Sequence, residues 1–182
     1  MAPKPIGKDA MLVELPPLWI ALLNVIGIPC AHLLLAWWST ALPSSLFSPN
    51  SLLHRTRAWE RGGSLYEKVF QVRLWKDRLP DGASWFAGFA KGSLKSRDPD
   101  YLRQFQVETC RGEFSHWVQT IVISLFVIWN PFPANLIIIG YAFLANLPCI
   151  ISQRHTRARL GKLLIVLEAK TAANASRPKG LS

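Results

Sequence analysis

Two long stretches of this 182-residue sequence contain no Asp, Glu, Lys or Arg. The first runs from Leu15 to Leu53 and the second from Phe114 to Gln153. Stretches of roughly 20 apolar residues are typical of transmembrane helices. A chain of this size is too small to build a core that hides both runs. The sequence therefore predicts an all-α integral membrane protein, with three transmembrane helices and further amphipathic helices at the interface.

Cysteines and acidic residues are scarce as well. The three cysteines lie in or beside apolar runs without a CxxC or zinc-ligand spacing, so they predict packed thiols and no disulfide framework. Eleven Asp and Glu stand against 21 Lys and Arg, which gives a formal net charge of +10. Because the basic residues flank the apolar runs, they fit the positive-inside rule and favour a membrane surface over nucleic acid.

The whole chain, 1–182, is predicted to be a single membrane domain. Its segments are a first span at 15–38, a cytoplasmic interfacial segment at 54–105, a helical hairpin of two spans at 106–151, an interfacial helix at 152–168 and a disordered tail at 169–182. The distribution of Lys and Arg places the N-terminus outside the cell membrane, with 54–105 and the C-terminus cytoplasmic. Whether 15–53 crosses once or twice stays open.

Local features sharpen this prediction. Asn130-Pro131-Phe132-Pro133 is expected to turn the hairpin, and Pro148 to kink its second helix. His32, inside the first span, is more typical of a hydrogen bond between helices than of a ligand. Lys68–Arg78 suits a helix or a strand, and Leu79–Gly82 predicts a turn.

A cluster of ionisable residues stands where the second apolar run begins. On a helix at about 100° per residue, Glu108, Arg111, Glu113 and His116 share one broad arc, whereas Cys110 lies on the apolar arc. Ionisable residues at the edge of a span are costly and usually functional. This arc is therefore the first candidate for a reaction site.

Four blocks of the chain carry a resemblance to a known family. They are Val72–Asp77, Leu79–Gly82, Glu108–Trp117 and Ala145–Leu160. In their order and spacing, across residues 64–167, they resemble the glycosyl-4,4'-diaponeurosporenoate acyltransferases of staphyloxanthin-type carotenoid biosynthesis. The resemblance implies a membrane O-acyltransferase that uses acyl-CoA as co-substrate, binds no cofactor, and esterifies the sugar of a glycosylated carotenoid or similar membrane lipid.

Acyl transfer to a hydroxyl requires a general base and donors for the oxyanion. His116 is the candidate base, because an unperturbed imidazole titrates at about 6.5. Glu113 precedes it by one helical turn and is expected to orient the ring, while Glu108 and Arg111 are expected to form an ion pair or to bind polar substrate. The candidate substrate-binding residues are Arg111, Asn146, Gln153, Arg154, Arg157, Arg73 and Lys76. Among these, Arg73, Lys76 and Arg154 suit the phosphates of acyl-CoA.

Other interpretations of the same residues stay open. The polar cluster also fits a non-catalytic membrane subunit that organises a lipid or pigment pathway. A third hypothesis is a membrane isomerase or cyclase with Glu108 or Glu113 as the acid. A thioester on Cys110 is disfavoured by helical phase, and a single Glu-x-x-His motif is too little to predict a metal site.

Overall fold

The computed structural model describes residues 11–79, 89 and 94–175, and these residues form helices and loops without a strand. One long helix consists of α1 (Pro17–Leu22), a π-helical turn η1 (Leu23–Gly27) and α2 (Ile28–Ala41). The other long helices are α5 (Pro99–Ser124), which ends in the 3₁₀ turn η6 (Leu125–Trp129), and α6 (Ala134–Ala175). Between α2 and α5 lie the short helices η2 (Ser44–Leu46), η3 (Ala58–Gly63), α3 (Ser64–Phe70), α4 (Val72–Trp75) and η4 (Lys76–Arg78).

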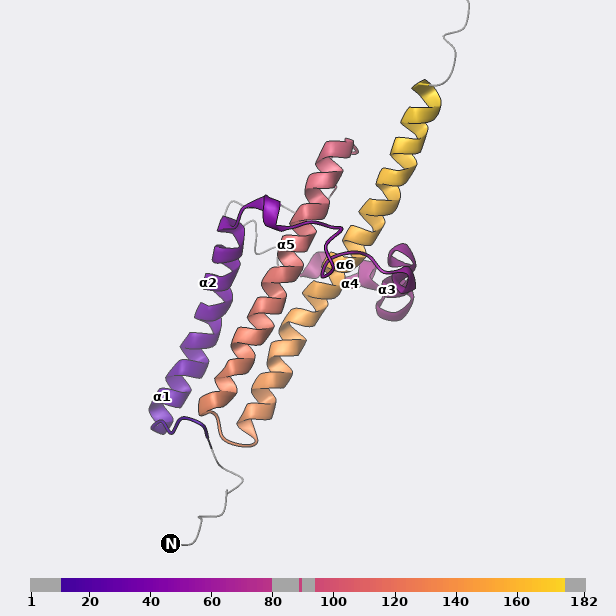
Figure 1. Ribbon diagram of the computed structural model, residues 1–182. Coiled ribbons are helices and arrows are strands. Elements are labelled where there is room, and N and C mark those ends of the chain that lie inside the picture. The colour runs from indigo at the N-terminus through magenta and orange to yellow at the C-terminus, as the bar shows by residue number, and fades with distance from the viewer. Residues whose placement is uncertain (1–10, 80–88, 90–93, 176–182) are drawn as a thin grey trace, which may run out of the picture.

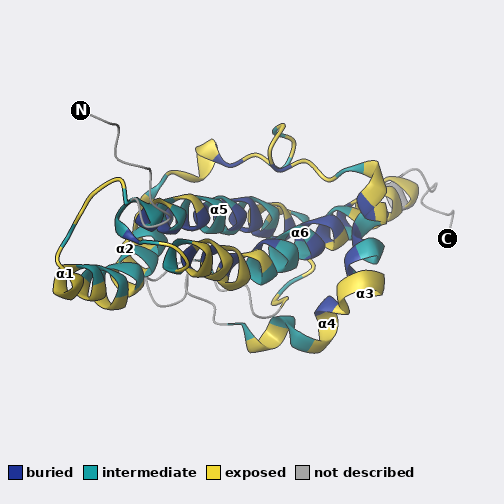
Figure 2. Cartoon of the chain, turned by 90° about the horizontal axis from the view of Figure 1, so that it is seen from below, coloured by how far each residue is buried: buried dark blue, intermediate teal, exposed yellow. Residues whose placement is uncertain are grey.

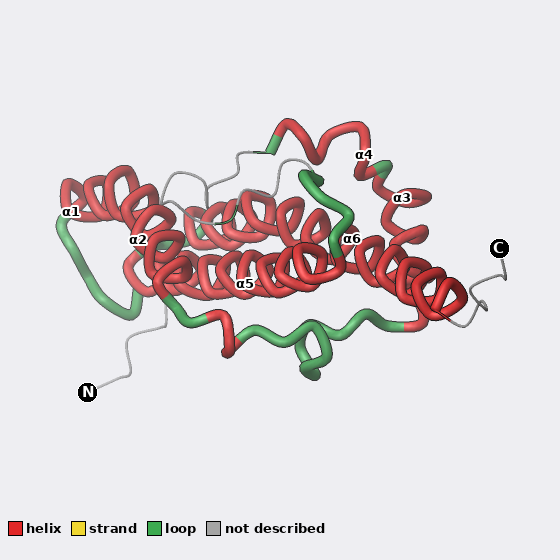
Figure 3. The backbone as a smooth tube through the Cα atoms, turned by 90° about the horizontal axis from the view of Figure 1, so that it is seen from above, coloured by secondary structure: helices red, strands yellow, loops and turns green. Residues whose placement is uncertain are grey.

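The long helices lie side by side (Figure 1). α5 and α6 run antiparallel and share the largest contact, while α2 packs against α5. α6 extends beyond its neighbours, and α3 and α4 pack beside its C-terminal half (Figure 3). The arrangement confirms the all-helical prediction and brings the middle segment of the chain against the last helix.

Burial is concentrated where α5 faces α6 (Figure 2). One buried apolar cluster lies near the hairpin turn and consists of Ile123, Phe126, Ile138 and Ala142. A second lies at the other end of the pair and consists of Leu102, Phe105, Leu160 and Leu164. By contrast, the first helix exposes large apolar side chains such as Leu18, Val25 and Leu34. An apolar helix surface that the protein leaves uncovered suits contact with lipid.

Two helices in the described part of the chain are long and apolar enough to cross a membrane. They are Pro17–Ala41, with a mean hydropathy of 2.1, and Ala134–Ala173, with 1.9. α5 is not among these two helices, and it carries charged residues that include Glu108, Arg111 and Glu113. These two helices support membrane association by length and composition, and the third span stays a prediction.

α6 differs from the predicted pattern. Residues 152–168 are not a separate interfacial helix, because the helix continues through Pro148 as far as Ala175. Leu160 and Leu164 pack on α5, and this apolar contact explains why the helix continues. Residues 169–175 of the predicted tail are likewise helical, whereas 176–182 lie outside the described residues.

The segment before α5 is also corrected. α5 begins at Pro99, so the end of the predicted interfacial segment belongs to the hairpin helix. The Asp98 carboxylate caps it by accepting hydrogen bonds from the backbone of Asp100 (3.1 Å) and Tyr101 (3.0 Å). Residues 68–78 are short helices. In the turn predicted at 79–82, residues 80–82 lie outside the described residues.

Polar side chains join the long helices at several levels. Asn24 Nδ2 donates to Asn130 Oδ1 (2.7 Å) near the hairpin turn. Further along, His32 Nδ1 lies 2.7 Å from Gln119 Oε1, and the Tyr141 hydroxyl lies 3.3 Å from His32 Nε2. The prediction that His32 makes a hydrogen bond between helices is confirmed. Such contacts fix helix register within an apolar surrounding.

Candidate active site

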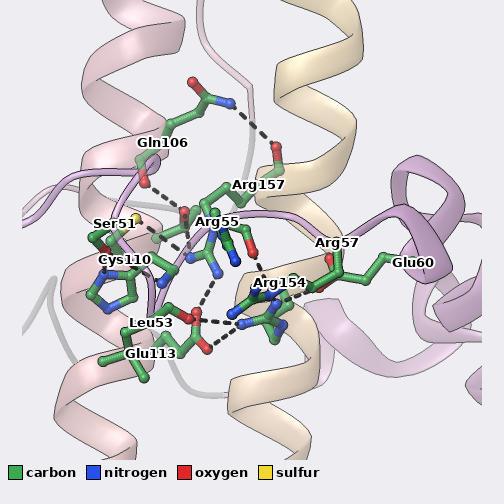
Figure 4. Close-up of polar contacts among 12 residues, drawn as sticks. Ser51, Leu53, Arg55, Arg57, Glu60, Gln106, Cys110, Glu113, Arg154 and Arg157 are labelled. Atoms are coloured by element: carbon green, nitrogen blue, oxygen red, sulfur yellow. Dashed lines mark hydrogen bonds and ion pairs between the residues drawn. The ribbon is translucent and has the colours of Figure 1, made fainter.

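Two arginines of α6 and two glutamates form a buried ionic network (Figure 4). Glu113 Oε1 lies 2.8 Å from Arg154 Nη1, and Glu113 Oε2 pairs with Arg157 Nη2. Arg154 also pairs with Glu60 of η3. The side chains of Glu60, Glu113 and Arg157 are at most 1% exposed. Two cations therefore balance two anions, and the network ties α5, α6 and η3 together.

Arg154 also fixes the segment that connects α2 to α3. Its Nε donates to the Tyr66 hydroxyl (3.1 Å), and its terminal nitrogens donate to the carbonyls of Leu53 and Arg55 (both 3.4 Å). Burial raises the pKa of the Tyr66 phenol, which keeps this acceptor uncharged at neutral pH. The loop between η2 and η3 thus gains a defined position on α6.

Arg157 reaches further into the helix pair. Its Nη1 donates to Thr109 Oγ1 (3.5 Å) and lies 3.6 Å from Cys110 Sγ. Cys110 therefore faces α6 in the protein interior, where it is fully buried. A cleft of about 490 Å³ opens beside Arg157, with polar lining residues that include Asn50, Thr56, Arg103, Gln106 and Glu168.

His116 lies on α5, one turn after Glu113, and its side chain contacts α6. Its Nδ1 lies 2.9 Å from Asn146 Oδ1. Asn146 Nδ2 donates to the Ala142 carbonyl (2.9 Å), so the amide oxygen must face the imidazole. His116 Nδ1 consequently carries the proton of the neutral ring, and Nε2 carries the lone pair. This is the tautomer in which Nε2 acts as a base.

Glu108 and Arg111 form the predicted ion pair, with Arg111 Nε 3.1 Å from Glu108 Oε2. The same guanidinium closes the C-terminal end of α2, because Nη1 donates to the carbonyls of Ser39 (3.1 Å) and Thr40 (3.0 Å). Both side chains are less than 10% exposed. Unpaired carbonyls at a helix end attract cations, so this contact stabilises the packing of α2 on α5.

The structure revises how the predicted residues are grouped. The hydrogen bond expected to orient His116 comes from Asn146, while the Glu113 carboxylate binds two arginines. Arg154 does not lie with Arg73 and Lys76: its guanidinium is neutralised inside the network, because its position on α6 faces α5 and η3.

The remaining predicted residues are placed as follows. Arg73 and Lys76 line a cleft between α4 and α6, and Gln153 is partly buried on α6. Sequence reasoning missed Glu60 and Tyr66, which lie far from the predicted arc along the chain. The sequence signal that could have identified Glu60 is its acidic side chain in a segment rich in Lys and Arg.

Ionised side chains buried at one end of an apolar helical bundle, beside an imidazole of fixed tautomer, define a candidate catalytic site of the membrane-enzyme type. The sequence model of glycosyl-4,4'-diaponeurosporenoate acyltransferases matches residues 49–165, which is more than half of the chain. This range contains the buried network as well as His116 and Asn146.

The curated relatives agree with this match. The chain is 31% identical over 134 residues to the glycosyl-4,4'-diaponeurosporenoate acyltransferases of Staphylococcus aureus strains Newman and RF122 / ET3-1. Each alignment covers 72% of this chain and 79% of the relative. No solved structure matches the chain. The chain belongs to the glycosyl-4,4'-diaponeurosporenoate acyltransferase family, and it is accordingly an acyltransferase, not a non-catalytic subunit, an isomerase or a cyclase.

Proposed function

We propose that this protein moves a fatty acyl group from acyl-CoA to a sugar hydroxyl of a glycosylated carotenoid or similar glycolipid, with His116 as general base. The acceptor follows from the name that the relatives carry. The observation that supports the base is the Asn146–His116 hydrogen bond, because a ring that donates from Nδ1 has Nε2 as its basic nitrogen when it is neutral. Positioned bases of this kind contribute about 10²–10⁴-fold to a rate.

In the proposed reaction, His116 Nε2 takes the proton of the sugar hydroxyl while the hydroxyl oxygen attacks the thioester carbonyl. The tetrahedral intermediate collapses to the ester, the carbon–sulfur bond breaks, and the imidazolium returns the proton to the departing thiolate. Asn146 Oδ1 accepts from Nδ1–H throughout and stabilises the imidazolium. Glu113 then acts by positioning α6, and Glu108 by positioning α2.

We propose that the cleft beside Arg157 holds a distal part of the acceptor, while the reacting hydroxyl lies at His116, because Gln106 of the cleft precedes His116 by ten residues on α5, about 15 Å along the helix. The lining of the cleft combines uncharged hydrogen-bonding groups, such as Asn50, Thr56 and Gln106, with an arginine and a glutamate. Groups of both kinds suit the alternating donors and acceptors of a sugar. Gln153 and Arg157 stay the proposed donors to the sugar or to the oxyanion, and Arg111 is proposed to act through the helix packing that it maintains.

The proposed topology has three spans in the cell membrane. Besides the two apolar helices, the uncharged stretch from Phe114 to Trp129 would form the third span. The N-terminus would then be outside, and the basic half of α6 with α3 and α4 would be cytoplasmic. This orientation supports the proposal because acyl-CoA is soluble in water and would reach the site from that side.

The test compares three variants of the full-length protein in vesicles supplied with acyl-CoA and a glycosylated carotenoid, with the ester product measured by mass spectrometry. We expect His116→Ala to lower kcat by about 10²–10⁴-fold. Asn146→Ala should lower kcat as well, because it removes the hydrogen-bond partner that holds the His116 ring in place. Asn135→Ala is the matched control, since the Asn135 side chain bonds only the backbone of Leu136 among the described residues.

Each result has a clear meaning. Product loss in His116→Ala with normal insertion supports the base. If the ester still forms at the wild-type rate in that variant, acyl transfer stands and His116 is not the base. If the wild-type protein forms no ester from acyl-CoA, the proposed donor or acceptor is wrong.

A further inference from the structure

The C-terminal half of α6 presents a second set of polar residues on a face that the buried network does not use. His155, Arg159 and Lys162 follow one another at i, i+4 and i+7, so they share one face of the helix. This face lies against Gly62 and Gly63, the residues that precede α3. Arg159 Cγ is 3.3 Å from a Cβ built on Gly63, and Lys162 Cε is 1.8 Å from one built on Gly62. Gly63 has a φ of 88°, and a Cβ there would also lie 3.2 Å from the His155 carbonyl oxygen, so glycine is favoured at this position.

Two adjoining clefts of about 460 and 520 Å³ lie along this face. They share Arg73, Arg159 and Leu163. The first also contains Glu67 and Lys162, and the second contains Lys76, Asp77 and His155. We call the two together the α3–α6 cleft.

The charges of the α3–α6 cleft are not balanced. Its lining holds four cationic side chains and two carboxylates, a net charge of +2 without His155. Glu67 lies 3.8 Å from Arg73 and 3.6 Å from His155, and the exposed Asp77 lies 2.9 Å from Lys76. Ion pairs that are open to solvent are weak. Arg159 and Lys162 form no ion pair within the described residues. An anion is therefore the chemical complement of this surface.

His155 provides an independent indication of a ligand. The residue is 2% exposed, and neither ring nitrogen makes a hydrogen bond within the described part of the chain. Nε2 lies 3.6 Å from Glu67 Oε2, which is too far for a hydrogen bond. Buried polar atoms usually have partners, because leaving one unpaired costs free energy. An oxygen-rich ligand in the cleft would supply the missing acceptor.

The other walls of the cleft are apolar. Leu94, Phe105, Leu160 and Leu163 line the second cleft, next to the cations. The ligand should therefore combine phosphate groups, which suit Arg and Lys, with an adjoining chain of low polarity. A phosphorylated pantetheine thioester has this composition, whether it belongs to acyl-CoA or to an acyl carrier protein.

We infer that the α3–α6 cleft binds the phosphopantetheine end of the acyl donor, with Arg159 and Lys162 joining Arg73 and Lys76 as phosphate ligands. The inference rests on the proposed function, because it concerns the donor of the same reaction. It assigns to Arg159 and Lys162 the phosphate contacts that the sequence assigns to Arg154.

The experiment measures steady-state kinetics with acyl-CoA and, separately, with an acyl carrier protein, together with binding of 4'-phosphopantetheine to the full-length protein. We expect Arg159→Gln and Lys162→Gln each to raise KM for the donor by about tenfold, with kcat within about twofold of wild type. Lys170→Gln is the matched control, because Lys170 is exposed on the same helix and lies outside the cleft. His155→Phe keeps an aromatic ring in place and should raise KM several-fold.

The outcomes separate this inference from the proposed function. If KM rises only with acyl-CoA, the ligand is the nucleotide thioester. A rise only with the carrier protein identifies the protein-linked thioester and still supports the cleft. If the variants lose 4'-phosphopantetheine binding although no ester forms, the cleft stands and the proposed reaction falls. Unchanged KM with both donors in an active enzyme would overturn the inference.

Discussion

Two groups of basic residues on α6 differ sharply, although they lie within nine positions of each other. Arg154 and Arg157 are enclosed by Glu60 and Glu113, and their charges are neutralised inside the protein. Arg159 and Lys162 line an open cleft in which cations outnumber carboxylates. The difference shows that residue type does not decide between structure and binding. The role of each residue depends on the neighbour that its side chain faces.

The largest expected effect tests the enclosed group. Arg157→Ala should lower the free energy of unfolding by about 3–5 kcal/mol, because it leaves the buried Glu113 carboxylate with one partner fewer. Arg159→Ala, two residues away, should change it by less than about 0.5 kcal/mol. Unfolding of both variants in detergent micelles, followed by circular dichroism, gives the comparison. Equal losses would mean that the two groups are not distinct.

Arg111 belongs with the enclosed arginines and should show an intermediate effect. Arg111→Ala removes three hydrogen bonds to backbone carbonyls at the end of α2, those of Ser39, Thr40 and Leu42, and the pairing with Glu108, at a cost of about 2–3 kcal/mol. Arg111→Lys should recover only part of this, since an ammonium lacks the planar fork of the guanidinium. Thermal unfolding midpoints measure both. Full recovery with lysine would show that charge alone suffices.

Ionic strength should distinguish the groups without a mutation. Exposed charges are screened by salt far more than buried pairs, because the Debye length falls to about 8 Å at 0.15 M. KM for the acyl donor should therefore rise several-fold between about 0.05 and 0.3 M salt, and less steeply in the Arg159→Gln/Lys162→Gln double variant. The unfolding midpoint should change little over this range. A KM that does not respond to salt would contradict phosphate binding in the α3–α6 cleft.

The smallest expected effect is a pH dependence at the edge of the enclosed network. Burial lowers the pKa of His54 below its ordinary 6.5; nearby Glu113 opposes the shift, and Arg157 and Arg154 add to it. The unfolded chain thus binds a proton more readily than the folded protein. Stability is complete above the unfolded pKa and decreases as the pH falls through that range. Unfolding midpoints between about pH 7.5 and 5.5 should fall less in His54→Gln than in wild type.

Several features could be predicted because they depend on neighbours in sequence. The uncharged runs predict the long helices, and the i, i+3 spacing of Glu108 and Arg111 predicts an ion pair that the structure contains. The interhelical hydrogen bond of His32 follows from one polar side chain inside an apolar run. Local spacing and hydropathy suffice for such features.

Other features could not be predicted from local sequence patterns, because they depend on contacts between residues far apart in the chain. Glu60 pairs with Arg154 across 94 residues, and Asn146 reaches His116 across 30. The helix end predicted after Ile151 was wrong, because Leu160 and Leu164 are buried against α5 and the helix continues. The local sequence contains no signal for this contact. Helical phase placed Cys110 on the apolar arc, opposite His116, whereas in the structure both residues contact α6 and the thiol lies beside Arg157.

The sequence by itself determined an all-helical chain with apolar runs, a polar arc on α5 and a basic second half of α6. Only the tertiary structure decided which of those basic residues are neutralised and which stay available to a ligand. The physical reason is that two faces of α6 pack against different parts of the chain. Positions 154 and 157 meet the carboxylates of η3 and α5, whereas 159 and 162 meet a glycine-containing turn and the cations of α4 and η4.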